Sequence, residues 1–165
     1  MKILEGKRGL IFGALDEKSI AWKVALNAYE QGAKFILSNA PIALRMGKIN
    51  ELAEKTGSRV IPADATSVDD LNKLFDESVK LLGGKLDFVL HSIGMSVNVR
   101  KGRQYTDQNY DFTIKGFDVS ALSFHKVLQS AWKNESMNDY GSIVALSYIA
   151  CLLYTSDAAD EAWCV

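Results

Sequence analysis

The clearest indication of the fold is the stretch RGLIFGALDEKSIA, residues 8–21, because the spacing of its apolar residues changes partway along. A short apolar run over residues 8–12 stops at Gly13, and helically spaced apolar residues begin after Ser19 and continue to Gly32. A short apolar run predicts a buried strand, and three-and-four spacing predicts a helix. The stretch therefore predicts a strand, a loop and a helix, in that order.

The same alternation recurs along the chain. Further strands are expected at residues 34–38, 59–63, 86–91 and 141–147. Helices are expected at about 42–56, from Ser67 to 82, and, after a polar loop from Ser92 to about Asp107, up to residue 133. Gly57 is expected to end the helix over residues 42–56, and Gly83-Gly84 the helix from Ser67 to residue 82. An apolar stripe is expected in the last helical region, formed by Val119, Leu122, Val127, Leu128 and Ala131.

The expected strands are apolar almost throughout, which is typical of a parallel sheet covered on both faces. We therefore predict an α/β fold with a doubly wound, Rossmann-like parallel sheet, truncated after strand five. Right-handed crossovers give the strand order 3-2-1-4-5. A ligand is expected at the carboxyl ends of the strands, where this order reverses between the first and the fourth.

Size and charge exclude several classes of protein. The chain has 165 residues, 48% of them hydrophobic, enough for one domain with a sizeable core. With 19 basic and 20 acidic residues the net charge is −1, which argues against nucleic acid or an anionic membrane as a partner. No apolar run approaches the roughly 20 residues of a membrane span, and the N-terminus lacks a signal peptide. A cytoplasmic protein is expected.

The last fifteen residues differ from the rest. Both cysteines, Cys151 and Cys164, lie there, so neither a disulfide nor a metal site is expected in the body of the chain. Residues 151–161 look like the translation of a sequencing-library adapter. We therefore expect an incomplete dinucleotide-binding domain over residues 1–150 and a non-native tail over 151–165.

Three segments at the strand ends carry candidate chemistry. Gly13 permits a tight turn and Ser19 opens a helix whose free amides can seat a pyrophosphate, although an ordinary loop with a serine cap would read the same. Asp64 can accept a hydrogen bond from adenine, or can cap the following helix. Gly94 permits close approach of a nicotinamide ribose, whereas a structural role is expected for His91. A valine at position 13 is expected to weaken cofactor binding and to leave the fold intact.

Residues 2–150 resemble the enoyl-acyl-carrier-protein reductases of bacterial fatty-acid synthesis, a divergent branch of the short-chain dehydrogenase/reductases. Residues 86–119 are most similar to Bacteroidetes-type members. The resemblance is carried by Gly6-Lys7-Arg8, Gly13 with Ser19-Ile20-Ala21, Asp64, His91-Ser92-Ile93-Gly94 and Leu146-Ser147-Tyr148.

The resemblance implies a role for particular residues. NADH is the implied cofactor, and NADPH is disfavoured because Ser38-Asn39-Ala40-Pro41 contains no base, although Arg45 lies one helical turn further on. The implied assignments are Gly13, Ser19 and Ile20 at the pyrophosphate, Asp64 and Ala65 at the adenine, Ile93 and Gly94 at the nicotinamide ribose, Ser96 at the substrate carbonyl, and Tyr148 as the first of two active-site tyrosines.

The resemblance also implies a reaction and partners. The reaction is hydride transfer from NADH to a trans-2-enoyl thioester on acyl-carrier protein, by a homotetramer with contacts along residues 107–133. Arg100, Lys101 and Arg103 could meet the carrier protein or could simply be solvated. Core or subunit-interface positions are expected for Phe112, Phe117, Phe124 and Trp132.

The family's second tyrosine, with a lysine seven residues after it, has no counterpart, because Tyr154 is followed by Glu161. The chain as given is therefore expected to be inactive. Two alternatives stay open: another short-chain dehydrogenase/reductase of the ketoacyl or sugar type, and a non-catalytic dinucleotide-binding module.

Overall fold

The computed structural model describes residues 2–147, which form a five-stranded parallel sheet. The strand order is β3-β2-β1-β4-β5, as predicted. The strands are β1 (Arg8–Phe12), β2 (Lys34–Asn39), β3 (Arg59–Pro62), β4 (Leu86–His91) and β5 (Met137–Ala145). The expected α/β doubly wound class is confirmed.

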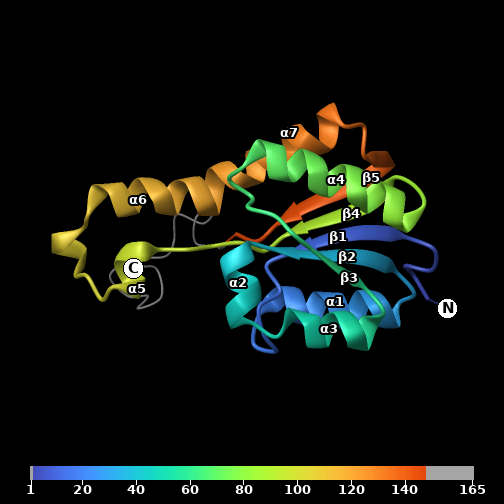
Figure 1. Cartoon of the computed structure of the whole chain (residues 1–165), viewed down its shortest axis with the longest axis horizontal. Coiled ribbons are helices and arrows are strands. Elements are labelled where there is room, and N and C mark those ends of the chain that lie inside the picture. Colours follow the sequence, from blue (N-terminus) through green and yellow to red (C-terminus); the bar gives the residue numbers. More distant parts are fainter. Residues whose placement is uncertain (1, 148–165) are drawn as a thin grey trace, which may run out of the picture.

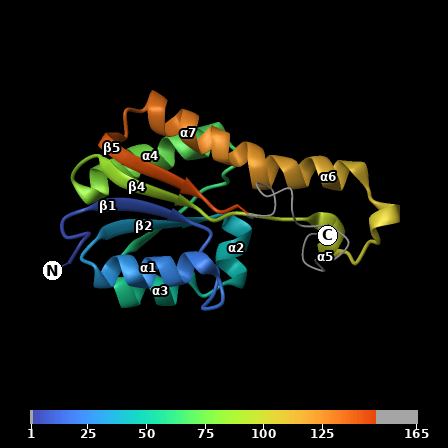
Figure 2. The same ribbon diagram turned by 180° about the vertical axis from the view of Figure 1, so that it is seen from behind.

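Helices cover the two faces of the sheet (Figures 1 and 2). On one face lie α1 (Ile20–Glu30) and α3 (Ile49–Thr56), and on the other lie α4 (Val68–Leu82) and α7 (Ser123–Lys133). Ser67 accepts a hydrogen bond from the Asp70 amide at the start of α4, and Gly57 and Gly83 end α3 and α4 with left-handed φ angles, as their chemistry predicts. No helix among residues 2–147 is long and apolar enough to cross a membrane.

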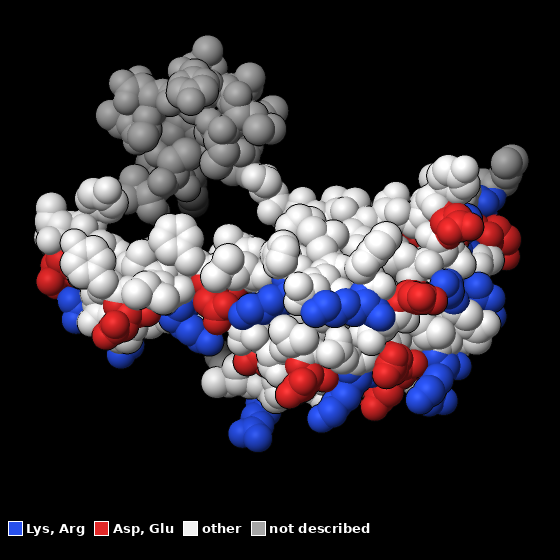
Figure 3. Space-filling view, turned by 90° about the horizontal axis from the view of Figure 1, so that it is seen from above, with Lys and Arg blue, Asp and Glu red and all other residues white. Residues whose placement is uncertain are grey.

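Charges of both signs are mixed on the surface. On the face over α4, α7 and a further helix, α6 (Tyr110–Phe117), basic and acidic side chains alternate in a band beside a broad uncharged area (Figure 3). This face offers no large basic patch of the kind that attracts nucleic acid. The mixture agrees with the small net charge of the sequence.

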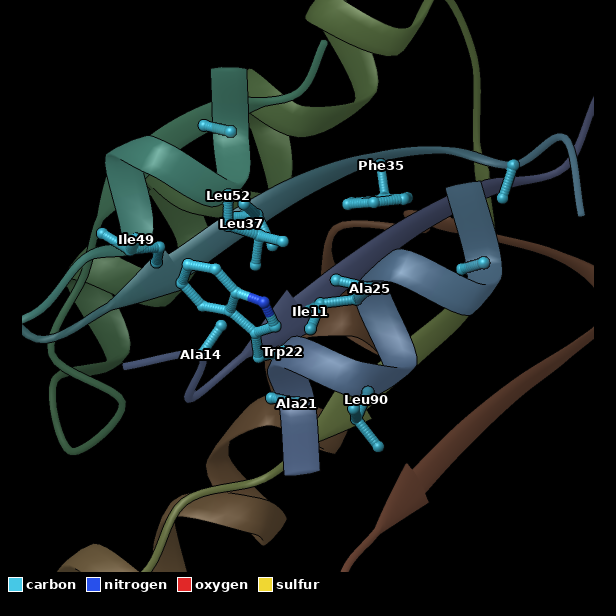
Figure 4. Close-up of a cluster of buried hydrophobic side chains, with 13 residues drawn as sticks. Ile11, Ala14, Ala21, Trp22, Ala25, Phe35, Leu37, Ile49, Leu52 and Leu90 are labelled. Atoms are coloured by element: carbon cyan, nitrogen blue, oxygen red, sulfur yellow. The ribbon is translucent and has the colours of Figure 1, made fainter. Parts of the chain in front are cut away.

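Burial on both faces explains why the strands are apolar runs. In β1, Leu10 and Phe12 pack under α4 and α7, whereas Ile11 packs under α1 and α3. Trp22 of α1 is 1% exposed and fills the space between α1, α3 and the sheet (Figure 4). Successive strand residues point to opposite faces, so a strand covered on both sides needs an apolar residue at every position.

The helix expected at 42–56 is two helices, α2 (Pro41–Met46) and α3. The break lies at Gly47, where a Cβ atom would lie 2.6 Å from the carbonyl oxygen of Leu15. That carbonyl accepts a hydrogen bond of 2.8 Å from the Lys48 amide. The β1–α1 loop thus takes a donor that a continuous helix would use internally.

We call residues 92–122 the arm; its first part, residues 92–107, was expected to be a polar loop and contains two short helices. The arm contains α5 (Val97–Arg100), the 3-10 helix η1 (Tyr105–Asp107), α6 (Tyr110–Phe117) and a π-helical turn η2 (Asp118–Leu122). It projects beyond the carboxyl ends of the strands (Figure 1). A buried polar side chain holds it together: Asn98 donates to the Asn109 carbonyl and to Thr113 Oγ1, and accepts from the Asn109 amide.

The expected apolar stripe is only partly buried. Val127 and Ala131 lie in the core, whereas Leu122 and Leu128 are exposed. The π-helical turn has more residues per turn than an α-helix, so it shifts the phase of the residues on either side. A single stripe drawn through 119–131 therefore cannot stay on one face.

Strand β5 begins earlier than the expected 141–147. Met137 pairs with Leu86, the register shifts, and pairing resumes at Ser142 opposite Phe88. Tyr140, in the shifted segment, has a φ of 62° and is fully exposed. The shift places three extra residues in β5, and an edge strand can bulge in this way without disturbing a second neighbour.

Candidate dinucleotide-binding site

The carboxyl ends of the five strands are joined by hydrogen bonds into one edge. The amide of Gly13 donates to the Ser38 carbonyl, that of Ala63 to the Asn39 carbonyl, and that of Leu146 to the His91 carbonyl, each at 3.1 Å. The edge faces α2 and the arm (Figure 1). The segments expected to bind a dinucleotide, which follow β1, β3 and β4, therefore lie along the same edge.

Gly13 is required by the fold itself. Its φ is +91°, and a Cβ atom there would lie 1.8 Å from the carbonyl oxygen of Ser92. The ends of β1 and β4 approach each other only because the side chain is missing. The expectation that a valine here leaves the fold intact is therefore wrong: the branched side chain would strike the backbone of the neighbouring strand end.

Ser19 does not cap its own helix. Its hydroxyl donates to the Asp16 carbonyl (2.6 Å) and accepts from the Leu15 amide (3.2 Å), so it stabilises the loop. Within residues 2–147 no group accepts a hydrogen bond from the amides of Ile20 or Ala21. The ordinary serine-cap alternative does not describe this loop, and the helix start keeps free donors of the kind that bind anions.

Asp64 closes the turn after β3 and keeps one oxygen free. Its Oδ1 accepts from both the amide and the hydroxyl of Thr66, each at 2.8 Å, while the cap of α4 is Ser67. Burial raises the pKa of Asp64, but the hydrogen bonds from Thr66 and the charges of Lys115 and Lys126 outweigh it and leave the pKa below its ordinary value. An ionised carboxylate accepts only, so Oδ2 suits a donor such as an exocyclic amine. Ala65 beside it is buried.

His91 is a structural residue. It is buried, and its Nε2 lies 2.8 Å from Ser123 Oγ. The Ser123 hydroxyl donates to the Val119 carbonyl (2.6 Å), so the hydrogen-bond network places the proton of a neutral His91 on Nε2. Burial lowers the pKa of His91, more than its backbone hydrogen bond raises it, which favours that neutral ring. The ring also meets Phe124, at 5.5 Å between centroids.

The segment after β4 runs out into the arm. Ile93 packs against the core, and Gly94 is exposed with nothing within 4 Å of where a Cβ would stand. Ser96 caps α5, because its hydroxyl accepts from the Val99 amide at 3.3 Å. Its side chain is thus engaged in the fold, and Ser96 lines a hollow of about 230 Å³ against α6.

The end of β2 carries no positive charge. Asn39 accepts from the Ala40 amide (2.9 Å) and donates to the Ala14 carbonyl (3.3 Å), so its side chain is fixed between β2 and the β1–α1 loop. Pro41 then begins α2, and Arg45 in its last turn is exposed.

The remaining candidates are placed separately. Tyr148 lies outside the described residues. Arg100, Lys101 and Arg103 do not form a free cluster, since Arg103 pairs with Asp107 at 2.9 Å and Lys101 lies over the Phe112 ring at 5.1 Å. Phe117 and Trp132 are exposed, which contradicts a core position for them within this chain.

Sequence reasoning missed the residues that tie the arm to the edge, above all Lys126, Asp118 and Ser120. Lys126 donates to the Thr66 carbonyl, 60 residues away, and Ser120 bonds the backbone of Met95, 25 residues away. Residue spacing cannot predict contacts between partners so distant in sequence. The sequence does indicate that Asp118 and Ser120 have a special role, because Asp and Ser are disfavoured in a helix interior.

Comparison with known proteins identifies the family. The family described as "Enoyl-(Acyl carrier protein) reductase" matches residues 13–161. The chain is 33% identical over 147 residues to enoyl-[acyl-carrier-protein] reductase [NADH] 1 of Rhizobium meliloti, covering 88% of this chain and 53% of the relative.

Solved structures give the same result. A FabI–NADH complex from Alistipes finegoldii superposes with a TM-score of 0.89 at 59% identity, covering 92% of this chain and 53% of that one. The Bacillus cereus enoyl-acyl carrier protein reductase with NADP+ and indole naphthyridinone has a TM-score of 0.78 at 29% identity, covering 91% and 58%. The chain spans about half the length of the relatives that it matches. The match over most of its own length shows that this chain belongs to the enoyl-acyl-carrier-protein reductase family.

Proposed function

We propose that the chain binds NADH along the carboxyl edge of its sheet. This proposal rests on polar groups at that edge that have no hydrogen-bond partner among residues 2–147. They are the amides of Ile20 and Ala21 and the Oδ2 atom of Asp64. A pyrophosphate fits the helix start, and an adenine amine fits the carboxylate. The open space at Gly94 accommodates the nicotinamide ribose beside Ile93.

The neutral end of β2 supports NADH over NADPH. A 2′-phosphate carries about two negative charges and calls for a nearby Arg or Lys. None lies in residues 38–41, and Asn39 is fixed by two hydrogen bonds of its own. The solved relatives include complexes with NADH and with NADP+. The preference for NADH over NADPH is therefore argued from the lack of a basic residue at the end of β2, and not from family membership.

We propose further that these residues form the cofactor-binding part of an enzyme that reduces trans-2-enoyl thioesters on acyl-carrier protein, for which bound NADH supplies the hydride. The protein's own part is to orient the cofactor and to stabilise negative charge developing on the thioester oxygen. Ser96 and Gly94 lie on the arm side of the nicotinamide position, where the thioester would enter. Tyr148 is proposed as a phenol at the acyl pocket.

Binding without turnover is the second candidate. No lysine follows Lys133 in the sequence, so the family's Tyr-x6-Lys pair is missing from this chain. Because losing one preorganised donor to an oxyanion already costs about 10²–10³ in kcat, we expect NADH binding but no measurable enoyl-thioester reduction. A ketoacyl-type reaction is less well supported, since the family matched is the enoyl class.

An assembly of several copies is part of the same proposal. Large apolar side chains on the outer face of the arm and on α7 are exposed, namely Tyr110, Ile114, Phe117 and Trp132. Surfaces of this kind on a protein of mixed charge are typical of subunit contacts. Sedimentation of the chain at several concentrations would show whether it self-associates.

Calorimetric titration with NADH and NADPH tests the binding proposal. We expect NADH to bind at least tenfold more tightly, about 1.4 kcal/mol. Asp64→Asn keeps an acceptor for Thr66 but replaces the free oxygen with a donor, so it should weaken NADH binding about tenfold. Asp69→Asn, an exposed acid in the first turn of α4, is the matched control and should change nothing. Equal affinity for the two cofactors, or an unaltered Asp64→Asn, would defeat the assignment.

Crotonyl-thioester-dependent oxidation of NADH tests turnover. The expected result is a chain that binds NADH and does not oxidise it. Oxidation that depends on the thioester would show that Tyr148 or another group replaces the missing pair.

A further inference from the structure

Lys126 bridges two segments that border the proposed cofactor site. It lies on α7, its side chain is 26% exposed, and its ammonium donates to the Thr66 carbonyl at 3.0 Å and to Asp118 Oδ1 at 2.6 Å. Thr66 belongs to the turn after β3, and Asp118 begins the π-helical turn η2. One side chain therefore connects the far end of the carboxyl edge with the base of the arm.

The turn whose Thr66 carbonyl accepts the hydrogen bond from Lys126 also orients the carboxylate of Asp64. The amide and hydroxyl of Thr66 both donate to Asp64 Oδ1, and the Asp64 amide donates to Asp70 Oδ2 at 3.1 Å. These bonds fix the carboxylate relative to its own turn. Ala63 and Ala65 of the turn pack in the same core as Val127 and Ala131 of α7, and the Lys126 bond to the Thr66 carbonyl adds a directional link to that helix from 60 residues away.

Asp118 sets the direction of the ammonium. Its carboxylate is 28% exposed and holds Lys126 at 2.6 Å, whereas Lys115 reaches it only at 3.9 Å. Charge-assisted hydrogen bonds that are partly screened from water are short and directional. In the same π-helical turn, Ser120 donates to the Met95 carbonyl (3.2 Å) and accepts from the Met95 amide (3.0 Å), so the turn also holds the segment after Gly94.

We propose that Lys126 is a positioning residue for the adenine end of the site. It holds the Asp64–Thr66 turn in the position in which Asp64 Oδ2 can accept a hydrogen bond from the adenine amine. The inference rests on the proposed binding of NADH. Without the ammonium the turn keeps its internal bonds and its apolar packing under α7 but loses the hydrogen bond that joins the Thr66 carbonyl to that helix. Ligands that carry the adenine then lose affinity, and the nicotinamide end is unaffected.

The test measures dissociation constants of NADH and of AMP for the full chain and its variants, by calorimetry and by NMR titration. Lys126→Met should weaken both ligands by the same factor, about tenfold, because both contain the adenine. A defect at the nicotinamide end would weaken NADH alone. Amide hydrogen exchange of Thr66 and Asp64 should be faster in this variant, while that of β1 and β4 is unchanged.

Lys115→Met is the matched control. It also removes one positive charge near Asp118 and Asp64, but Lys115 donates to no group of the Asp64–Thr66 turn, so both affinities should stay within twofold of the parent. Lys126→Arg, which keeps a charged donor, should restore most of the affinity. Should Lys126→Met fail to fold, as judged by circular dichroism, Asp118→Asn releases the ammonium while conserving volume, and should weaken both ligands by a smaller, equal factor.

The outcomes separate the two proposals. If the parent chain binds NADH and AMP and the Lys126 and Asp118 variants bind them equally well, the positioning role is wrong and the proposed function stands. An effect of Lys115→Met as large as that of Lys126→Met would also overturn it, since charge alone would then explain the loss. If the parent binds neither ligand, the proposed function fails, and the role of Lys126 falls with it.

Discussion

Two tryptophans on helices that flank the same sheet have opposite environments. Trp22 of α1 is 1% exposed, enclosed by α3 and the central strands, whereas Trp132 of α7 is 84% exposed. Beside Trp132 lies a hollow of about 640 Å³, in which the apolar Leu128 and Ile143 stand among charged side chains such as Lys133 and Asp139. The centre of the sheet is closed by its own helices, while the β5 side and the arm present apolar surface outward. Apolar contacts therefore hold the centre together, whereas the arm is held by polar contacts such as those of Asn98 and Ser120.

The largest effect is expected at the closed centre, with Gly13→Val. The new side chain would strike the Ser92 carbonyl, and valine does not tolerate a φ of +91°. We expect a loss on the order of 5 kcal/mol or more, comparable with the whole stability of a domain this size. Urea denaturation followed by circular dichroism measures it. Gly94→Ala on the arm side, where the Cβ position is empty, is the control and should unfold like the parent; a stable Gly13→Val chain would break the comparison.

The two tryptophans give the next largest difference. Trp22→Ala leaves a cavity in the core and should cost about 3–5 kcal/mol in the free energy of unfolding. Trp132→Ala should change it by less than about 0.5 kcal/mol, because the ring is in contact with water in both states. Both variants are read from the same denaturation curves at low protein concentration. A substantial cost at Trp132 would mean that the β5 side is covered after all, by another copy or by chain outside the described residues.

Asn98→Ala tests the polar attachment of the arm. The side chain is 2% exposed and makes three hydrogen bonds, to the Asn109 backbone and to Thr113. Buried partners left unsatisfied cost about 1–3 kcal/mol, and we expect that loss to be local. Hydrogen exchange should accelerate in α5 and α6 and remain slow in β1. Uniform acceleration through the sheet would instead join the arm and the centre into a single cooperative unit.

The smallest effect is a pH dependence at the boundary between the two regions, where His91 meets Ser123. The pKa of His91 in the folded chain lies below 6.5, its ordinary value in the unfolded chain, because of burial. Below pH 6.5 the unfolded chain binds the proton more readily, so the contribution of His91 to stability falls as the pH drops from 6.5 toward the lower folded pKa, and well above pH 6.5 that contribution no longer changes. His91→Gln should remove this slope in a series of denaturation curves. His125→Gln, at an exposed position on α7, should keep it.

The strands and helix ends of the closed centre could be predicted from the sequence, because each depends on a short stretch of neighbouring residues. The run over residues 8–12 and the four expected runs after it became the strands of one parallel sheet, and Ser67, Gly57 and Gly83 marked helix ends with their own chemistry. The arm was not readable in this way. Asn98 and Ser120 are polar residues whose partners are 11 to 25 positions away, so residues 92–107 were predicted to form a polar loop and the contact of Ser120 in the expected helical region was not foreseen.

The amino-acid sequence alone predicts the alternation of strands and helices, the order of the strands, the sheet edge at which we expect a ligand, and the family resemblance, because periodicity, caps and short motifs act over a few residues. Only the tertiary structure decided that Gly13 is required by the Ser92 backbone, that Gly47 breaks a helix against Leu15, and that Lys126 holds the turn after β3. Each of these depends on two backbones or side chains that meet across the sheet edge, and contacts between residues distant in sequence leave no periodic trace in either segment.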